Sequence, residues 1–221
     1  IYYQGTKETE ALEKLEQLVS TNLKNKKNID SAIILILSSF KALNNYEWSN
    51  LLTNEASYKD VFIRQVLEPK IENNLKMNVP SLDEINNKIS SKVRLQYEEN
   101  PYPRWVNLGL SIYPKSLYMI TKELKLKIRK SYIRELKIPK ILIAGCGTGQ
   151  NSIGTASMFR DSDILSIDLS LKSLSYAKRK TKELGLTNIK YMQADILDID
   201  LLNVKFDFIE SVGVVQQMEN P

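Results

Sequence analysis

From Lys140 onward the chain alternates short apolar segments with helical stretches, and this alternation restricts the fold more than any other feature. The apolar segments are KILIAG, DILSID, IKYMQAD and FDFIESV, and helical patterns over 151–160 and 170–185 separate the first three. Strands that alternate with helices at this spacing build parallel sheets from βαβ units. The sequence therefore predicts an α/β fold for residues 140–221.

The first hundred residues have a helical pattern and no convincing strand. Apolar residues recur at helical spacing over 6–28, and Asp30 and Ser31 look like the start of a second helix that runs to about Leu43. Further helices are expected over 58–76 and 81–98. In the segment SLDE, Ser81 is the expected N-cap and Glu84 completes a capping box.

A proline-rich and aromatic segment, YEENPYPRWVNLG, follows these helices. Two prolines stop the preceding helix and hold the chain extended. Large aromatic residues on such a stiff segment indicate that it covers a pocket, or that it only packs the linker onto the core. We expect three parts: a helical region over 1–96, a proline/aromatic linker and cap over 97–139, and the α/β domain over 140–221.

The first strand of that domain runs directly into three glycines, Gly145, Gly147 and Gly149. Glycine permits sharp turns and lets a ligand approach the backbone closely, and the helix that follows presents its positive end. The spacing differs from the dinucleotide pattern G-x-G-x-x-G, because Gln150 takes the sixth position. A generic tight turn remains the alternative to a ligand loop.

Carboxylates follow the second and third strands. Asp168 lies about 20 residues beyond the glycines, where an acidic side chain can accept hydrogen bonds from both ribose hydroxyls. Asp195 can accept a hydrogen bond from the exocyclic amine of an adenine, and Ile196 can contact the adenine ring. A ligand with adenine and ribose but without a pyrophosphate fits this set, and S-adenosylmethionine is such a ligand.

These segments resemble the motifs of class I S-adenosylmethionine-dependent methyltransferases. IAGCGTG looks like the first motif, SID like the second, QADI like the third and FDFIESVGVV like the fourth. Together with the glycine loop, YEENPYPRW and the helix sequence SLSYAKRKTKELG narrow the resemblance to a bacterial subfamily similar to rickettsial protein-lysine methyltransferases. The resemblance implies a helical N-terminal region followed by about four parallel strands, the first part of a Rossmann-like methyltransferase sheet.

The motifs and the resemblance together give a set of expected site residues. The cofactor-binding candidates are Ala144, Gly145, Cys146, Gly147, Gly149, Asp168, Leu169, Ala194, Asp195, Ile196 and Ser211. The candidates for a substrate or methyl pocket are Tyr97, Tyr102, Arg104 and Trp105, because aromatic faces attract a sulfonium. No residue stands out as a catalytic base, and no metal site is expected.

The expected activity is methyl transfer from S-adenosylmethionine to a protein side chain, with lysine as the acceptor. Nucleic-acid amino-methyltransferases carry a proline-aromatic motif after the fourth strand, where this chain has ESVGVV, so nucleic acid is not the expected substrate. The family fold has seven strands, and about four can be identified before Pro221. The domain is therefore expected to be truncated at its C-terminus. The alternative to the enzyme is a non-catalytic remnant that acts through its helical region.

Composition narrows the location and the chemistry. The chain has 221 residues, a formal net charge of +5, a single cysteine and no histidine, which excludes histidine-based triads and internal disulfides. The most apolar run, AIILIL, is far too short to span a bilayer. From these features we expect the protein to be cytoplasmic. The abundance of Ile, Lys and Asn in the chain suggests a bacterial source. A homodimer through the helical region is one expectation for its assembly.

Overall fold

The computed structural model describes residues 5–127, 130–159 and 161–218, and the chain divides into two compact units between Ile71 and Glu72. In the described residues, no helix is both long enough and apolar enough to cross a membrane.

The first unit is helical, as the sequence predicts. It contains α1 (Thr6–Lys24), α2 (Ser31–Phe40), α3 (Lys59–Phe62), a π-helical turn (Ile63–Leu67) and the start of α4 (Glu68–Lys76), with short 3₁₀ turns at Leu43–Asn45, Ser49–Leu51 and Ala56–Tyr58. The expected start of α2 is confirmed, because the Asp30 side chain accepts a hydrogen bond of 2.9 Å from the Ala32 amide. The core of this unit contains Val19, Ile34, Leu37, Leu43, Tyr46, Trp48, Leu52, Tyr58 and Phe62.

The expected capping box at Ser81 is wrong. Helix α5 (Lys88–Glu99) begins seven residues later, and its N-cap is Asn87, whose side chain accepts from the amides of Ile89 and Ser90 at 2.9 and 3.1 Å. Ser81 instead forms an isolated parallel bridge with Gln193. The backbone around Ser81 finds its hydrogen bonds at the edge of a strand, so no helix starts there.

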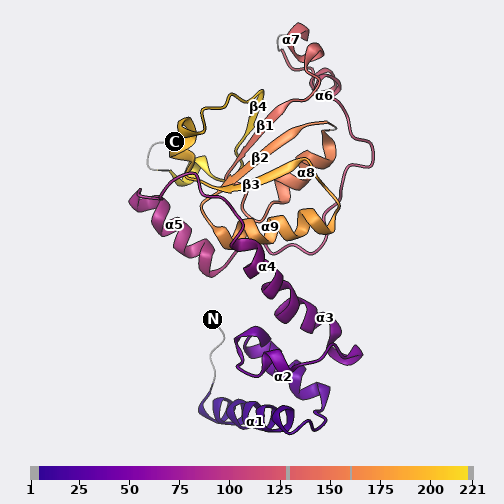
Figure 1. Cartoon of the computed structure of the whole chain (residues 1–221), viewed down its shortest axis with the longest axis vertical. Helices are drawn as coiled ribbons and strands as arrows, with labels where there is room; N and C mark the ends of the chain where they lie inside the picture. The colour runs from indigo at the N-terminus through magenta and orange to yellow at the C-terminus, as the bar shows by residue number, and fades with distance from the viewer. Residues whose placement is uncertain (1–4, 128–129, 160, 219–221) are drawn as a thin grey trace. The chain divides into compact units, whose positions relative to one another are not determined.

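The second unit is built on a four-stranded parallel sheet. Its strands are β1 (Lys140–Ala144), β2 (Asp163–Asp168), β3 (Ile189–Gln193) and β4 (Phe208–Glu210), in the order β3-β2-β1-β4 (Figure 1). All four predicted strands are found. The predicted fold class, a helical region followed by a Rossmann-like parallel sheet, is confirmed.

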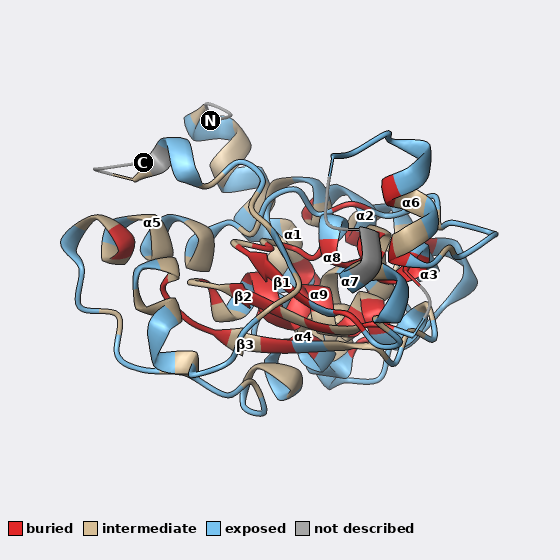
Figure 2. Ribbon diagram, turned by 90° about the horizontal axis from the view of Figure 1, so that it is seen from above, coloured by how far each residue is buried: buried red, intermediate tan, exposed pale blue. Residues whose placement is uncertain are grey.

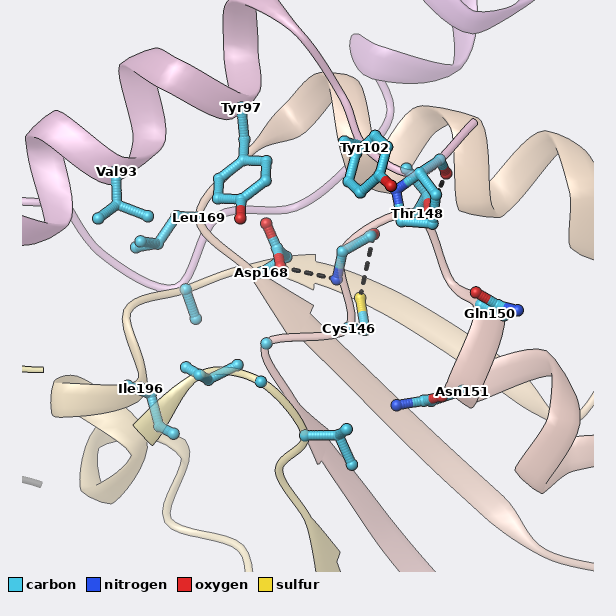
Figure 3. Close-up of a pocket in the computed structure, with 17 residues that line it drawn as sticks. Val93, Tyr97, Tyr102, Cys146, Thr148, Gln150, Asn151, Asp168, Leu169 and Ile196 are labelled. Carbon is cyan, nitrogen blue, oxygen red and sulfur yellow. Dashed lines mark hydrogen bonds between the residues drawn. The ribbon is translucent and has the colours of Figure 1, made fainter. Parts of the chain in front are cut away.

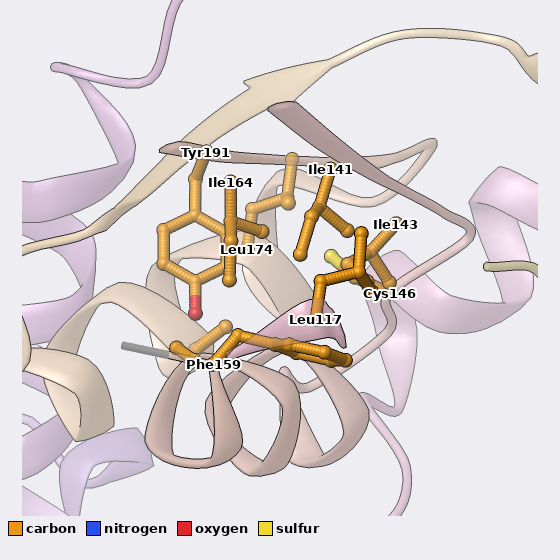
Figure 4. Close-up of a cluster of buried hydrophobic side chains, with 10 residues drawn as sticks. Leu117, Ile141, Ile143, Cys146, Phe159, Ile164, Leu174 and Tyr191 are labelled. Carbon is orange, nitrogen blue, oxygen red and sulfur yellow. The ribbon is translucent and has the colours of Figure 1, made fainter. Parts of the chain in front are cut away.

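Helices and apolar side chains cover both faces of this sheet. The further elements are α6 (Leu117–Glu123), α7 (Lys130–Glu135), α8 (Gln150–Met158), α9 (Leu171–Glu183) and the 3₁₀ segments Ile196–Leu202 and Val215–Gln217. On one face Ile141, Ile143 and Ile164 pack against Phe159 of the α8 end and Leu174 of α9 (Figure 4). On the other face the core contains Leu142, Ala144, Ile167 and Ala194. Burial on both faces explains why β1 is apolar at nearly every position, and Figure 2 shows the buried residues along the strands.

Candidate active site

A cavity of about 230 Å³ lies where the carboxyl ends of the strands meet helix α5 and the proline-rich segment that follows it (Figure 3). Its wall combines the glycine loop after β1, the end of β2, the segment after β4, helix α5 and the proline segment. Ligand sites of open parallel sheets form at this edge, because the loops that leave the strands diverge there. The expected cofactor loop and the expected aromatic cap therefore meet at one cavity.

The three glycines of the loop have different roles. All three have positive φ, at +76° for Gly145, +52° for Gly147 and +83° for Gly149. A Cβ on Gly145 would lie 2.1 Å from Cγ2 of Val214, and one on Gly149 would lie 2.5 Å from Cβ of Ala177. A Cβ on Gly147 would meet no atom within 4 Å, although this residue lines the cavity. Two glycines therefore permit close packing, and Gly147 leaves space for a ligand.

The carboxylate of Asp168 ties the glycine loop to the end of β2. Its Oδ2 accepts a hydrogen bond of 2.8 Å from the Gly147 amide, and its Oδ1 accepts one of 2.9 Å from the Ser170 amide. Burial raises the pKa of this carboxyl, and these two amides act in the opposite direction. A carboxylate has about four acceptor positions. Asp168 lines the cavity and can therefore still accept hydrogen bonds from a ligand.

A second cavity of about 200 Å³ adjoins the first, with Val93, Leu169, Ile196 and Val214 lining both. Asp195 lines only the second cavity, and its Oδ1 accepts a hydrogen bond of 3.1 Å from the Leu197 amide. The shared residues are apolar. The two cavities together form an elongated site with one carboxylate in each part.

One face of α5 follows this elongated site. Ile89, Val93 and Tyr97 are four residues apart, so they share one side of the helix. Ile89 lines the second cavity, Val93 lines both and Tyr97 lines the first. Figure 3 shows Tyr97 pointing from α5 toward Asp168. Tyr102 and Pro103 continue this wall beyond the helix end.

The structure brings most of the expected site residues together. Those that line the first cavity are Tyr97, Tyr102, Gly145, Cys146, Gly147, Asp168, Leu169, Ala194 and Ile196, and Asp195 lines the second. Five expected residues line neither cavity: Ala144, Gly149, Ser211, Arg104 and Trp105. Ala144 is 1% exposed and packs with Leu142 and Ile167 in the core. The Ser211 hydroxyl is buried and has no hydrogen-bond partner among the described residues.

Arg104, which was expected at the substrate pocket, lines neither cavity and binds Glu72. Its Nη1 and Nη2 donate to the two carboxylate oxygens of Glu72 at 3.1 and 2.9 Å, and its guanidinium lies 4.6 Å from the ring centroid of Tyr176. Arg179 of α9 also binds Glu72, with Nε donating at 3.0 Å, and its side chain is 2% exposed. Arg104 therefore fastens the proline segment to α4 and α9.

Trp105 likewise lies outside both cavities. Its ring is 9% exposed and packs edge-on against Tyr176, and the Tyr176 hydroxyl donates a hydrogen bond to its carbonyl. Its indole Nε1 donates to the Thr148 carbonyl at 3.1 Å, and Thr148 Oγ1 donates to the Pro103 carbonyl at 2.7 Å. Trp105 thus supports the cavity wall from behind.

Several lining residues were not among the sequence candidates: Val93, Pro103, Thr148, Gln150, Asn151, Val212, Gly213 and Val214. Gln150 and Asn151 directly follow the last glycine, where α8 begins, so their position was a usable signal. The three residues after Ser211 belong to FDFIESVGVV, which was noted as a motif but not assigned residue by residue. Nothing in the local sequence separates Val93 from the other apolar residues of α5.

Cys146 is a packing residue of the loop. Burial raises the pKa of its thiol well above the usual value, and the charge of Asp168 acts in the same direction. A protonated thiol is a poor nucleophile. Across the described residues, no three His, Cys, Asp or Glu side chains are grouped so that they could hold a metal ion.

The parallel sheet, the glycine loop and the two carboxylates at strand ends define a class I S-adenosylmethionine-dependent methyltransferase domain. Residues 141–221 match the family model described as "Methyltransferase domain". This comparison identifies the α/β part of the chain as a domain of that class.

Curated relatives share this part of the chain. One stretch of 121 residues is 31% identical to the uncharacterized protein RP028 of Rickettsia prowazekii. This stretch covers 55% of this chain and 46% of that protein. Another of 80 residues is 32% identical to (S)-coclaurine N-methyltransferase of Papaver somniferum, covering 36% of this chain and 22% of that enzyme. The matched stretch spans less than half the length of each of these two relatives.

Parts of this chain also match two solved structures. PKMT2 from Rickettsia typhi in complex with AdoHcy is 31% identical, with 37% of this chain and 16% of that chain covered and a TM-score of 0.35. Magnesium protoporphyrin IX methyltransferase from Synechocystis PCC 6803 with bound SAM is 19% identical, with 62% and 67% covered and a TM-score of 0.42.

Proposed function

We propose that the second unit binds S-adenosylmethionine along the two adjoining cavities and transfers its methyl group to the amine of a protein lysine. The observation that carries this proposal is the pairing of Gly147, which leaves open space, with the Asp168 carboxylate on the same cavity. A ligand can approach the backbone there and donate hydrogen bonds to an anionic acceptor.

The site residues support one orientation of the cofactor. Asp168 accepts hydrogen bonds from the ribose hydroxyls, and Asp195 accepts one from the exocyclic amine of the adenine in the second cavity. Val93, Leu169 and Ile196 supply the apolar walls that the adenine ring needs. The carboxylate of the methionine part lies toward the N-terminus of α8, where the helix dipole favours negative charge.

The acceptor in this reaction is an amine that arrives without its proton, because only a neutral nitrogen has the lone pair that attacks the methyl carbon. The amine nitrogen attacks the methyl carbon in line, the carbon–sulfur bond breaks, and its electron pair stays on sulfur as a neutral thioether. The alkylated ammonium then releases a proton to solvent. Tyr97 and Tyr102 line the first cavity, and their faces favour the cationic sulfonium and ammonium.

Lysine is the acceptor that we propose because of the resemblance of YEENPYPRW and the α9 sequence to rickettsial protein-lysine methyltransferases. The similarity to (S)-coclaurine N-methyltransferase agrees with nitrogen as the acceptor atom.

The test begins with calorimetric titration of the chain with S-adenosylmethionine and S-adenosylhomocysteine. Radiolabelled methyl transfer is then measured on lysine-containing proteins, with the same proteins blocked by acetylation of their lysine amines as the control. Binding together with transfer to unblocked protein only is the expected result. Transfer that is equal with blocked protein would eliminate lysine, and a lack of cofactor binding would eliminate the proposed function.

An interaction role for the helical unit is the second candidate. In α2, Leu35 and Ile36 are 38% and 44% exposed, and Leu18 of α1 is 45% exposed. Exposed apolar side chains on neighbouring helices support association through this unit, such as a homodimer. Sedimentation velocity should show the mass of a dimer, and Ile36→Lys should convert it to a monomer while the control Ser39→Lys does not.

A further inference from the structure

Glu98, near the end of α5, binds the loop between β2 and α9. Its Oε1 accepts a hydrogen bond of 3.0 Å from the Lys172 amide and one of 3.2 Å from the Ser170 hydroxyl. Its Oε2 accepts one of 2.9 Å from Nζ of Lys76. Glu98 itself lines neither cavity, although its neighbour Tyr97 does. The carboxylate thus contacts the loop outside the two cavities.

The contacts of Glu98 continue to the glycine loop. Ser170, which Glu98 binds through its hydroxyl, donates its amide to Asp168 Oδ1 at 2.9 Å. Asp168 Oδ2 accepts from the Gly147 amide at 2.8 Å. A series of hydrogen bonds through Ser170 therefore connects α5 to the Asp168 carboxylate and the Gly147 amide, and both of these residues line the first cavity.

Glu98 is ionised in this arrangement. Burial alone would raise the pKa of its carboxyl, but the hydrogen bonds from Lys76, the Lys172 amide and the Ser170 hydroxyl lower it below the usual range. A charged acceptor binds amide and hydroxyl donors about twice as strongly as a neutral one. The charge of Glu98 therefore restrains the Ser170–Lys172 backbone more tightly than a neutral side chain would.

We propose that Glu98 is a positioning residue for ribose recognition, which it serves by holding Ser170 and, through it, the Asp168 carboxylate. This inference rests on the proposed function, because it assigns a role within the same cofactor site. It also gives helix α5 a specific role in the site. Helix α5 covers the ligand, and in addition it fixes the orientation of the acceptor that reads the ribose.

A residue that only joined α5 to α9 would affect all ligands alike. The discriminating measurement therefore compares S-adenosylhomocysteine with its 2′,3′-dideoxy analogue, which lacks the hydroxyls that Asp168 would bind. The variants are Glu98→Gln and Glu98→Ala. The matched control is Glu99→Gln, because the side chain of the adjacent Glu99 is exposed and makes no hydrogen bond or ion pair within the described part of the chain.

The expected result is that Glu98→Ala weakens S-adenosylhomocysteine binding about 10-fold, which corresponds to one misplaced hydrogen-bonding group. Glu98→Gln should give a smaller loss, since its amide oxygen keeps one neutral acceptor. The dideoxy analogue should lose less than about 2-fold with either variant, and Glu99→Gln should change neither affinity. Equal losses for both ligands, or no loss for either, would overturn the inference.

Amide hydrogen exchange in the ligand-free protein separates this inference from the proposed function. Glu98→Ala should accelerate exchange at Ser170, Lys172 and Gly147, while Glu99→Gln leaves them as in the parent. Unchanged exchange at Gly147 would show that Glu98 does not act through Asp168, whatever the ligand does. If the parent chain binds neither ligand, the proposed function fails and the ribose role fails with it.

Discussion

The indole Nε1 of Trp105 donates a hydrogen bond of 3.1 Å to the backbone carbonyl of Thr148, which is the residue between the second and third glycines of the loop. Both partners are buried, with exposed fractions of 9% and 2%. The proline-rich segment that carries Trp105 and the glycine loop are therefore joined by a hydrogen bond whose two partners are buried.

Replacing Trp105 with Phe should lower the free energy of unfolding by more than the loss of buried ring area alone would. The Thr148 carbonyl would lose its donor in a buried position, which costs about 1–3 kcal/mol. We expect a lower urea midpoint and weaker cofactor binding. Trp48→Phe is the matched control, since Trp48 is also buried but its Nε1 has no partner among the described residues. Equal destabilisation by both changes would show that the hydrogen bond adds nothing.

Gly147→Val should abolish cofactor binding while both units remain folded. The new side chain would occupy open space at the cavity, and the positive φ of +52° is unfavourable for a β-branched residue. Calorimetry measures the binding, and circular dichroism checks the fold. Gly154→Ala on α8 is the control, because its Cβ meets no atom within 4 Å, and it should bind as the parent does. Normal affinity of the valine variant would refute the loop assignment.

Asp168→Asn should weaken S-adenosylhomocysteine binding by about 1.5–3 kcal/mol, the range for hydrogen bonds to a charged group. The neutral amide offers one acceptor oxygen, and its NH₂ group opposes the Gly147 amide that Asp168 now binds. The dideoxy analogue should lose less. A loss of the same size for both ligands would mean that Asp168 does not contact the ribose.

The same carboxyl predicts a pH dependence with a defined sign. Burial raises the pKa of Asp168 above that of an unfolded aspartate, although hydrogen bonds from the Ser170 and Gly147 amides oppose this shift. The folded state therefore binds the proton more tightly than the unfolded chain. Its contribution to stability is complete below the unfolded pKa and is lost as pH rises through the higher folded pKa.

Two measurements should consequently change in opposite directions as the pH is lowered. The unfolding free energy of the parent minus that of Asp168→Asn should increase, because only the parent gains from protonation. The cofactor affinity of the parent should fall over the same range, because a protonated carboxyl is a weaker acceptor for the ribose hydroxyls. A stability difference that is constant from about pH 7 to about pH 4 would show that the pKa of Asp168 is not raised.

The sequence predicted the sheet well because its strands are buried on both faces, which makes them short, apolar and easy to delimit. The position of Gly145, Gly147 and Asp168 at the cavity was also predictable, since each closely follows or ends a predicted strand. The start of α5 was not, because the signal at Ser81 is local and the competing partner, Gln193, is more than a hundred residues away.

The aromatic segment shows the same limit in the site. Its composition indicated that it covers something, and Tyr97 and Tyr102 do line the cavity. The separate roles of Arg104 and Trp105 depend on Glu72 and Thr148, which are about 30 and 40 residues away in either direction. No periodicity or motif within the segment distinguishes a residue that faces a ligand from one that fastens the segment to the core.

The ion pairs of Glu72 also determine where this protein can be cut for structural work. A recombinant fragment that starts at Lys88, the first residue of α5, would keep all four strands. Such a fragment would lack Glu72, whose carboxylate binds the buried Arg179 side chain. Removing one partner of a buried guanidinium costs up to about 3–5 kcal/mol, so a soluble methyltransferase fragment should begin upstream of Glu72 and retain the second half of α4.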